Sequence, residues 1–169
     1  MRHGLLYTVL GLALALAQTA AAMPDCTGKS SEIPAELSAW NMRTAVAAAP
    51  AASAAPEVTL GGAADVALAK DSSIAYAAAP GKAGAADSHG GLLALDVTDA
   101  GTYQVALGGK AWVDVIRDGR AIPSTTHGHG PDCSGIAKIV DFPLEPGRYL
   151  VQIAGSASPA ITLLVLRRP

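Results

Sequence analysis

The feature that most constrains this chain is a short pattern that occurs twice in its C-terminal half. The segments 99–107 and 145–153 share an acidic residue followed at alternate positions by Gly, Tyr, Val and an aliphatic residue. The glycine permits a tight turn, and the alternation places the tyrosine and the aliphatic side chains on one face of a strand. The pattern therefore predicts two β-hairpins in related positions, since a solenoid would need about three or more copies.

Further strand signals continue on both sides of this repeat. Asp118 and Gly119 separate two such runs, and an Asp-Gly pair is a strong signal for a two-residue hairpin. Short strands with turn signals between them favour an all-β fold over a βαβ fold. The predicted architecture is an antiparallel β-sandwich, jelly-roll-like, with about eight strands. Candidate strands lie at 58–60, 66–68, 73–77, 92–97, 103–107, 111–117, 120–122, 136–142, 148–153 and 161–166.

The first 22 residues have the features of a secretory signal peptide. A basic start at Arg2 precedes an uncharged apolar run, and the small residues 20–22 suit a signal peptidase. We expect cleavage after Ala22 and a periplasmic or secreted protein. The alternative is an uncleaved anchor, because the segment 4–22 is about long enough for a marginal span. We expect no integral membrane segment in the mature chain.

Residues 23–56 differ in composition from the rest of the chain. We expect a short helical turn at 34–40, whose Trp40 anchors an extended N-terminal arm on the folded body. The tract 45–56 is rich in Ala and Pro and has no periodicity, which is typical of a linker or a surface arm. The predicted organisation is a signal peptide at 1–22, an N-terminal arm and Ala/Pro-rich linker at 23–56, and a β-sandwich domain at 57–169.

The charge balance excludes one class of function. The formal net charge is −2 and the pI is about 6.0, whereas a dedicated nucleic-acid binder needs a basic surface for phosphate contacts. Alanine occupies 36 of the 169 positions, so much of the apolar fraction consists of small methyl groups. We therefore expect no nucleic-acid partner, and a core in which a few aromatic side chains bury a large share of the apolar area.

The chain contains two cysteines, Cys26 and Cys133. An oxidising compartment favours a disulfide between them, which would tie the N-terminal arm to the folded body. The alternative is that Cys133 is a free thiol available to a metal.

The two Gly-x-Tyr strands and the last apolar strand carry a resemblance to a known family. The segments 101–103, 146–151 and 161–165 resemble the bacterial pre-peptidase C-terminal type of β-sandwich, over roughly residues 90–168. The chain is also similar to small exported proteobacterial proteins of unknown function. The resemblance implies a non-catalytic secretion or binding module. Two departures are expected: no attached protease, and a loop at 125–135 that the family does not require.

That loop carries the side chains best suited to chemistry. His127 and His129 are separated by one residue, so in an extended backbone both imidazoles project to the same side. Imidazoles and a thiolate are good ligands for zinc or copper, and a carboxylate adds an oxygen ligand. The sequence therefore predicts a zinc or copper site formed by His127, His129, Cys133 and Asp132.

Other interpretations of the loop stay open. Asp87 and His89, from another loop, would complete the metal shell. If Cys133 forms the disulfide, either the His-Gly-His-Gly-Pro segment is a polar turn between strands, or the remaining metal ligands are His127 and His129 with His89 or Asp132. A Ser-His-acid hydrolase would need Ser134 to converge in space with a histidine and Asp132.

Trp112 and Asp114 form a second candidate site, because alternation places them on one face of a strand. If Val113 and Val115 face the core, Trp112 lies at the surface. A surface tryptophan beside a carboxylate is a platform for a carbohydrate or a peptide. The alternative is that Trp40 and its arm cover it.

Three functions follow, in order of preference. The first is an exported, non-catalytic β-sandwich module that binds a protein, peptide or glycan partner. The second is a periplasmic zinc- or copper-binding protein that uses the His127 to Cys133 loop. The third is a small hydrolase.

Overall fold

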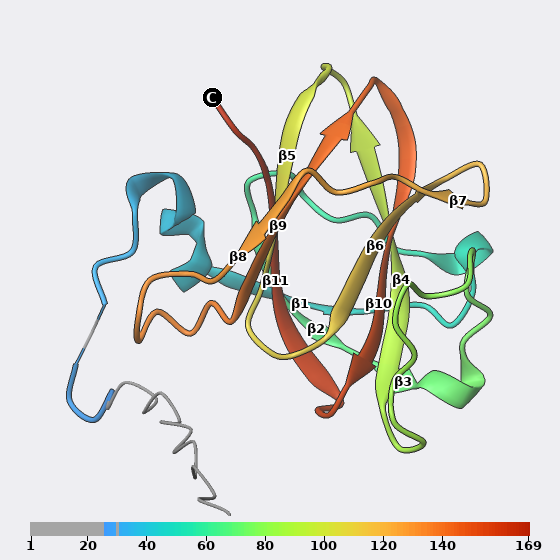
Figure 1. Cartoon of the computed structure of the whole chain (residues 1–169), viewed down its shortest axis with the longest axis horizontal. Coiled ribbons are helices and arrows are strands. Elements are labelled where there is room, and N and C mark those ends of the chain that lie inside the picture. The colour runs from blue at the N-terminus through green and yellow to red at the C-terminus, as the bar shows by residue number, and fades with distance from the viewer. Residues whose placement is uncertain (1–25, 30) are drawn as a thin grey trace, which may run out of the picture.

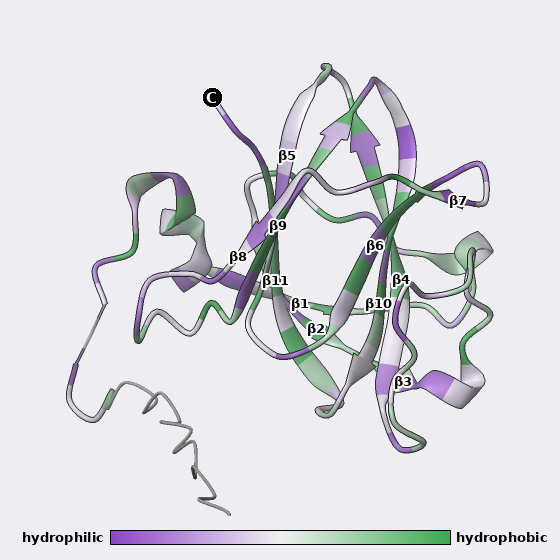
Figure 2. Cartoon of the chain, in the orientation of Figure 1, coloured by the Kyte–Doolittle hydropathy of each residue, from purple (hydrophilic) through white to green (hydrophobic). Residues whose placement is uncertain are grey.

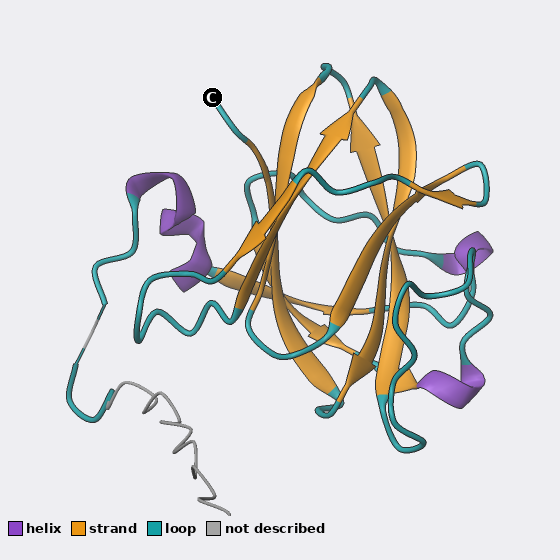
Figure 3. Ribbon diagram, in the orientation of Figure 1, coloured by secondary structure: helices purple, strands orange, loops and turns teal. Residues whose placement is uncertain are grey.

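A computed structural model of the protein describes residues 26–29 and 31–169. Its strands form two packed sheets, so the predicted β-sandwich is confirmed (Figure 1, Figure 3). The predicted signal peptide at 1–22 lies outside the described residues. The elements are η1 (Ala35–Asn41), β1 (Arg43–Ala47), η2 (Ala52–Ala54), β2 (Ala63–Ala67), β3 (Ala69–Lys70), η3 (Asp71–Ser73), β4 (His89–Val97), β5 (Gly101–Leu107), β6 (Trp112–Arg117), β7 (Arg120–Ala121), β8 (Thr126–Gly128), β9 (Lys138–Leu144), β10 (Gly147–Ser156) and β11 (Ala160–Arg167).

The chain passes repeatedly between the two sheets. One sheet has the strand order β1-β2-β11-β5-β9-β8 and the other β3-β4-β10-β6-β7. The longer strands β4, β5, β6, β9, β10 and β11 therefore lie alternately in the second and the first sheet. Strands β1 and β2 pair in parallel, and the other named strand pairs in the described part of the chain are antiparallel. This path gathers the loops of both sheets at the ends of the sandwich.

The main core fills the space between the sheets. It is built from alternate residues of the strands, such as Val105 and Leu107 in β5 and Val113 and Val115 in β6. Figure 2 shows the hydrophobic residues along β6 and β11 and hydrophilic ones near β7 and the C-terminus. Burial of these aliphatic and aromatic side chains is the main favourable term for folding.

The repeated sequence pattern has a shared structural role. The hydroxyl of Tyr103 donates a hydrogen bond to the Asp99 carbonyl at 2.8 Å, and Tyr149 donates to the Glu145 carbonyl at 2.8 Å. Each tyrosine thus closes the turn four residues before it, as a tyrosine corner does in other β-sandwiches. Both rings belong to the main core. The two segments therefore occupy related positions, one in each sheet, as predicted. The two predicted hairpins are wrong, because β4 and β5, and likewise β9 and β10, lie in different sheets, so each of these turns carries the chain from one sheet to the other.

A second apolar cluster covers the outer face of the first sheet. Trp40, fully buried in η1, packs there with Leu37 and against Ala106 and Leu164. The Arg43 guanidinium lies over the Trp40 ring, 5.3 Å from its centroid. The predicted helical turn and the anchoring by Trp40 are thus found in the structure. Both faces of β11 are covered along 163–166, and these four residues form an apolar run and not an alternation.

The Ala/Pro-rich tract contributes to the sheets. Residues 43–47, expected to lie in the arm and linker, form β1 at the edge of the first sheet. The residues that follow pair with the exposed edge of β4: Ala49 exchanges two backbone hydrogen bonds with Leu92, and Pro56 and Val58 bond to Ala94. The tract therefore covers a sheet edge that would otherwise present unpaired backbone groups.

Small side chains allow this close approach. A Cβ atom added at Gly91 of β4 would lie 2.5 Å from the Ala48 side chain. Such packing depends on partners from elsewhere in the chain. Consequently, the Ala/Pro-rich tract shows no hydrophobic periodicity of its own in the sequence.

The predicted strands differ from the observed ones in five places. The described residues contain eleven strands and not about eight, because β1, β3 and β8 were not expected. The segments 58–60 and 73–77 are not strands. Beside the first, Glu57 forms only an isolated bridge, and within the second Ala75 does so. The Asp-Gly hairpin is confirmed, with Asp118 and Gly119 at φ values of 51° and 72° between the paired strands β6 and β7.

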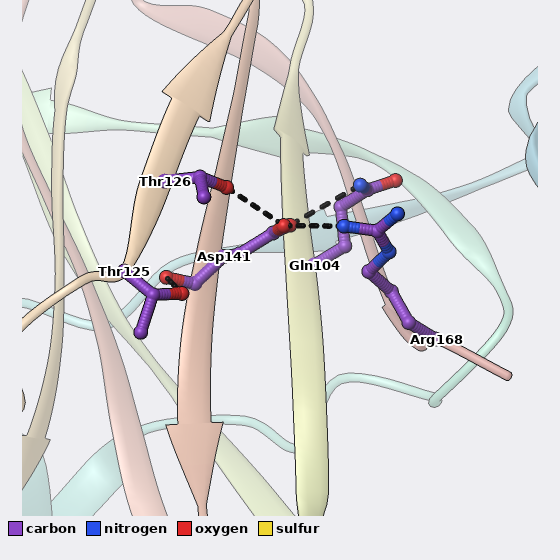
Figure 4. A network of polar contacts seen from close by, with 5 residues as sticks. All are labelled: Gln104, Thr125, Thr126, Asp141 and Arg168. Carbon is purple, nitrogen blue, oxygen red and sulfur yellow. Dashed lines mark hydrogen bonds and ion pairs between the residues drawn. The ribbon is translucent and has the colours of Figure 1, made fainter.

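A buried carboxylate joins the C-terminus to the edge of the first sheet (Figure 4). Asp141 of β9 accepts hydrogen bonds from Thr126 of β8 at 2.8 Å and from Gln104 of β5 at 3.2 Å. Arg168 forms an ion pair with the same carboxylate at 2.8 Å. The Asp141 side chain is only 4% exposed, so its charge needs these partners. The network fixes the short strand β8, which carries His127.

Replacing Asp141 by asparagine is expected to lower the free energy of unfolding by about 1–3 kcal/mol, because the charge-assisted bonds are lost. Urea denaturation measures the change. Asp96→Asn is the matched control, since Asp96 pairs with Arg148 at 3.3 Å on the surface and exposed pairs contribute less than about 1 kcal/mol. An equal loss for the two variants would contradict the assigned role of Asp141.

Candidate functional site

A groove lies at the end of the sandwich where loops from both sheets meet. Its volume is about 750 Å³, within the range of small-ligand sites. The walls come from the β5–β6 loop at 108–111, the β8–β9 loop at 129–137, the residues 82–83, and Ala154 with Gly155 in β10. We call it the Trp112 groove. It brings together parts of both candidate sites of the sequence, the His-Cys loop and Trp112.

The disulfide between Cys26 and Cys133 borders the groove. The two cysteines are bonded, with a Cα–Cα distance of 5.3 Å, so the predicted disulfide is confirmed. Figure 1 shows the β8–β9 loop beside the N-terminal segment that this bond holds. Because its sulfur is in the disulfide, Cys133 has no thiolate to offer a metal. The bond instead fixes one wall of the groove.

The other loop residues do not converge as a metal shell. His127 lies in the exposed edge strand β8, whereas the Nδ1 atom of His129 bonds to the Ala137 carbonyl at 2.8 Å. His129 and the exposed Asp132 line the groove, and His127 does not. Across residues 26–29 and 31–169, no group of three or more His, Cys, Asp or Glu is placed to hold a metal ion.

Asp87 and His89, the additional candidate metal ligands, lie elsewhere. His89 is in β4, and Asp87 forms an ion pair with Lys70 at 3.8 Å. The Ser134 hydroxyl accepts a hydrogen bond from the Ile136 amide at 3.1 Å, which closes a tight turn after the disulfide. This partner is a backbone amide, as expected for a structural turn residue.

Trp112 is held in a fixed orientation on the opposite wall. Its indole Nε1 donates to Asp114 at 2.8 Å, and the Gly81 amide donates to the other oxygen of the same carboxylate at 3.1 Å. Val113 and Val115 face the core as expected. Trp40 packs on the outer face of the other sheet, within the second cluster. The structure therefore places Trp112 at the groove and Trp40 in the second cluster.

Three lysines line the groove, a cluster that could not be predicted from the sequence. Lys138 extends over the Trp112 ring, 4.9 Å from its centroid, and donates to the Ala111 carbonyl at 3.1 Å. Lys82 and Lys110 are exposed on the facing loops. Burial lowers the pKa of Lys138, the charge of Lys82 lowers it further, and Asp114 opposes the shift. The groove thus concentrates positive charge on a chain whose net charge is negative.

A second polar cluster supports the groove from behind. Asp71 accepts hydrogen bonds from Tyr76 at 2.6 Å and from the amide of Gly155, a wall residue, at 3.0 Å. Ser88 also donates to it at 2.5 Å. Burial opposes ionisation of Asp71, but these bonds and the charge of His89 hold its pKa below the usual value. The ionised carboxylate therefore fixes the bulged part of β10 at the groove.

The signal for the lysine cluster is weak in the sequence. The three lysines occur singly in three segments that are distant along the chain, two in loops and Lys138 at the start of β9. Only the crossing of the chain between sheets brings those segments together.

In comparisons with known proteins, the chain matches no protein-family model and no curated protein. No helix in the described part of the chain is long and apolar enough to cross a membrane.

Proposed function

We propose that the protein is an exported, non-catalytic binding module, built on a jelly-roll-like β-sandwich, whose partner occupies the Trp112 groove. The observation that carries the proposal is the groove itself, at about 750 Å³. The disulfide agrees with a periplasmic or secreted location, because such bonds persist in oxidising compartments. The sequence resemblance to the pre-peptidase C-terminal type of sandwich supports the same class of function.

The groove has the properties of a preformed binding site. The disulfide holds one wall, the Trp112–Asp114 hydrogen bond orients the other, and Asp71 fixes the β10 wall at Gly155. Rigid walls reduce the entropy that is lost when a partner binds. Much of the lining consists of Gly and Ala, which leave room for the side chains or rings of a partner.

A blocking substitution tests the proposal. Ala83 is exposed and lines the groove, so Ala83→Trp is expected to fill it without disturbing the core. Wild type and variant are applied to an array of short peptides and oligosaccharides. We expect ligands that bind wild type to lose binding to Ala83→Trp and to be recovered chemically unchanged by mass spectrometry.

The control places the same side chain outside the groove. Ala121 is exposed on β7, beyond the far end of β6, and Ala121→Trp is expected to bind like wild type. Binding that survives in Ala83→Trp would place the partner elsewhere and overturn the proposed site. A cleaved ligand would overturn the non-catalytic assignment.

A further inference from the structure

The lysines of this chain are unevenly distributed. The sequence contains five, and three of them, Lys82, Lys110 and Lys138, line the Trp112 groove. Like charges in one groove repel one another. Such an arrangement costs free energy in the unliganded protein, and a negatively charged ligand would relieve it.

The local carboxylates leave much of this positive charge uncompensated. Asp114 is 8% exposed, and its two oxygens already accept bonds from Trp112 and Gly81. Asp132 is the exposed carboxylate among the lining residues. Among the described residues, neither Lys82 nor Lys110 forms an ion pair. Their ammonium groups are therefore free to contact a partner.

We infer that the partner of the groove is an acidic peptide segment, whose carboxylates contact Lys82, Lys110 and Lys138. This inference rests on the proposed function and names the chemistry of its partner. Lysine ammonium groups act as point charges that suit single carboxylates along a flexible chain. The glycines and alanines at the walls allow the backbone of an extended segment to approach closely.

The position of Lys138 favours a peptide over a glycan. A sugar ring binds tryptophan by stacking on an open ring face, but the Lys138 ammonium already lies over the Trp112 ring. A sugar on that face would have to displace the cation. A peptide carboxylate can instead form an ion pair with the Lys138 ammonium in the position that it already occupies. The cation–π contact also holds the ammonium in position for a ligand.

Fluorescence anisotropy with a labelled hexaglutamate peptide tests the inference. We expect saturable binding to the full mature protein that weakens as salt is raised, because salt screens exposed charges. The double variant Lys82→Gln with Lys110→Gln is expected to bind about tenfold more weakly. Lys138 is left unchanged in this variant because it also contacts Trp112 and Ala111.

The matched control removes two positive charges away from the groove. Arg120 and Arg148 are exposed beyond the opposite end of β6, so Arg120→Gln with Arg148→Gln is expected to bind like wild type. Equal weakening in both double variants would show attraction to overall charge and would overturn the inference. Unchanged circular dichroism and unfolding midpoints establish that the variants remain folded.

The remaining outcomes separate this inference from the proposed function. Lysine-dependent binding of hexagalacturonate, without binding of hexaglutamate, would replace the peptide by an acidic glycan and leave the binding module intact. If neither probe binds, the inference of an acidic partner is overturned. The proposed function would then be decided separately by the array with Ala83→Trp, since that experiment requires no charged ligand.

Discussion

Tyr149→Ala is expected to lower the free energy of unfolding by about 3–5 kcal/mol, the range for truncating a large buried aromatic residue. The side chain is 3% exposed and belongs to the main core. Its hydroxyl also accepts hydrogen bonds from the Glu145 amide at 3.1 Å and from Arg117 at 3.0 Å. The variant therefore loses packing and leaves these donors without their acceptor. Guanidinium denaturation of wild type and variant measures the change.

Tyr149→Phe separates the two contributions. It keeps the ring in the core and removes only the hydroxyl, so the expected loss is about 1–3 kcal/mol. Tyr103→Phe removes the equivalent bond to Asp99 and is expected to have an effect of similar size. If Tyr149→Ala cost less than Tyr149→Phe, the ring would contribute nothing to the core, contrary to its burial.

Removing the disulfide with Cys26→Ser and Cys133→Ser together is expected to lower the free energy of unfolding by about 2–5 kcal/mol. The bond joins residues 107 positions apart, so it strongly restricts the unfolded chain. In the chain-entropy model a loop of this length contributes nearly 5 kcal/mol. Thermal or urea unfolding of the oxidised wild type and the double variant gives the difference.

The folded structure is expected to survive this loss, because Trp40 and β1 hold the N-terminal segment independently of the disulfide. Fully reduced wild type serves as the control, and we expect it to unfold at the same midpoint as the double variant. Equal stability of oxidised wild type and the double variant would contradict the role of the bond. Substituting both cysteines avoids a new disulfide between molecules.

The repeated pattern shows how local sequence encoded part of the fold. Each acidic-x-Gly-x-Tyr segment contains both its turn and the tyrosine that closes it, with the hydrogen-bond acceptor four residues earlier. The Asp118-Gly119 hairpin is equally local. For such features the interacting groups are neighbours in the chain, so composition and spacing suffice to predict them.

The candidate site was only partly predictable. Trp112, Asp114, His129, Asp132 and Cys133 were identified individually from their residue types, and the structure places them at or beside one groove. The predicted metal site has no thiolate ligand, because the Cys133 sulfur is bonded to Cys26. The lysine cluster could not be predicted, because its members stand singly and far apart in the sequence and a single lysine is ordinarily a solvated residue.

Residue types and spacing alone were enough to predict the β-sandwich class, the Asp118-Gly119 hairpin, the disulfide and the anchoring by Trp40. Two features became evident only from the folded chain: the Ala/Pro-rich tract covers the edge of β4, and three distant lysines meet beside Trp112. The difference lies in the range of the interactions. Turns and alternation act between near neighbours in the chain, whereas edge pairing and groove charge depend on which segments the crossings between sheets bring together.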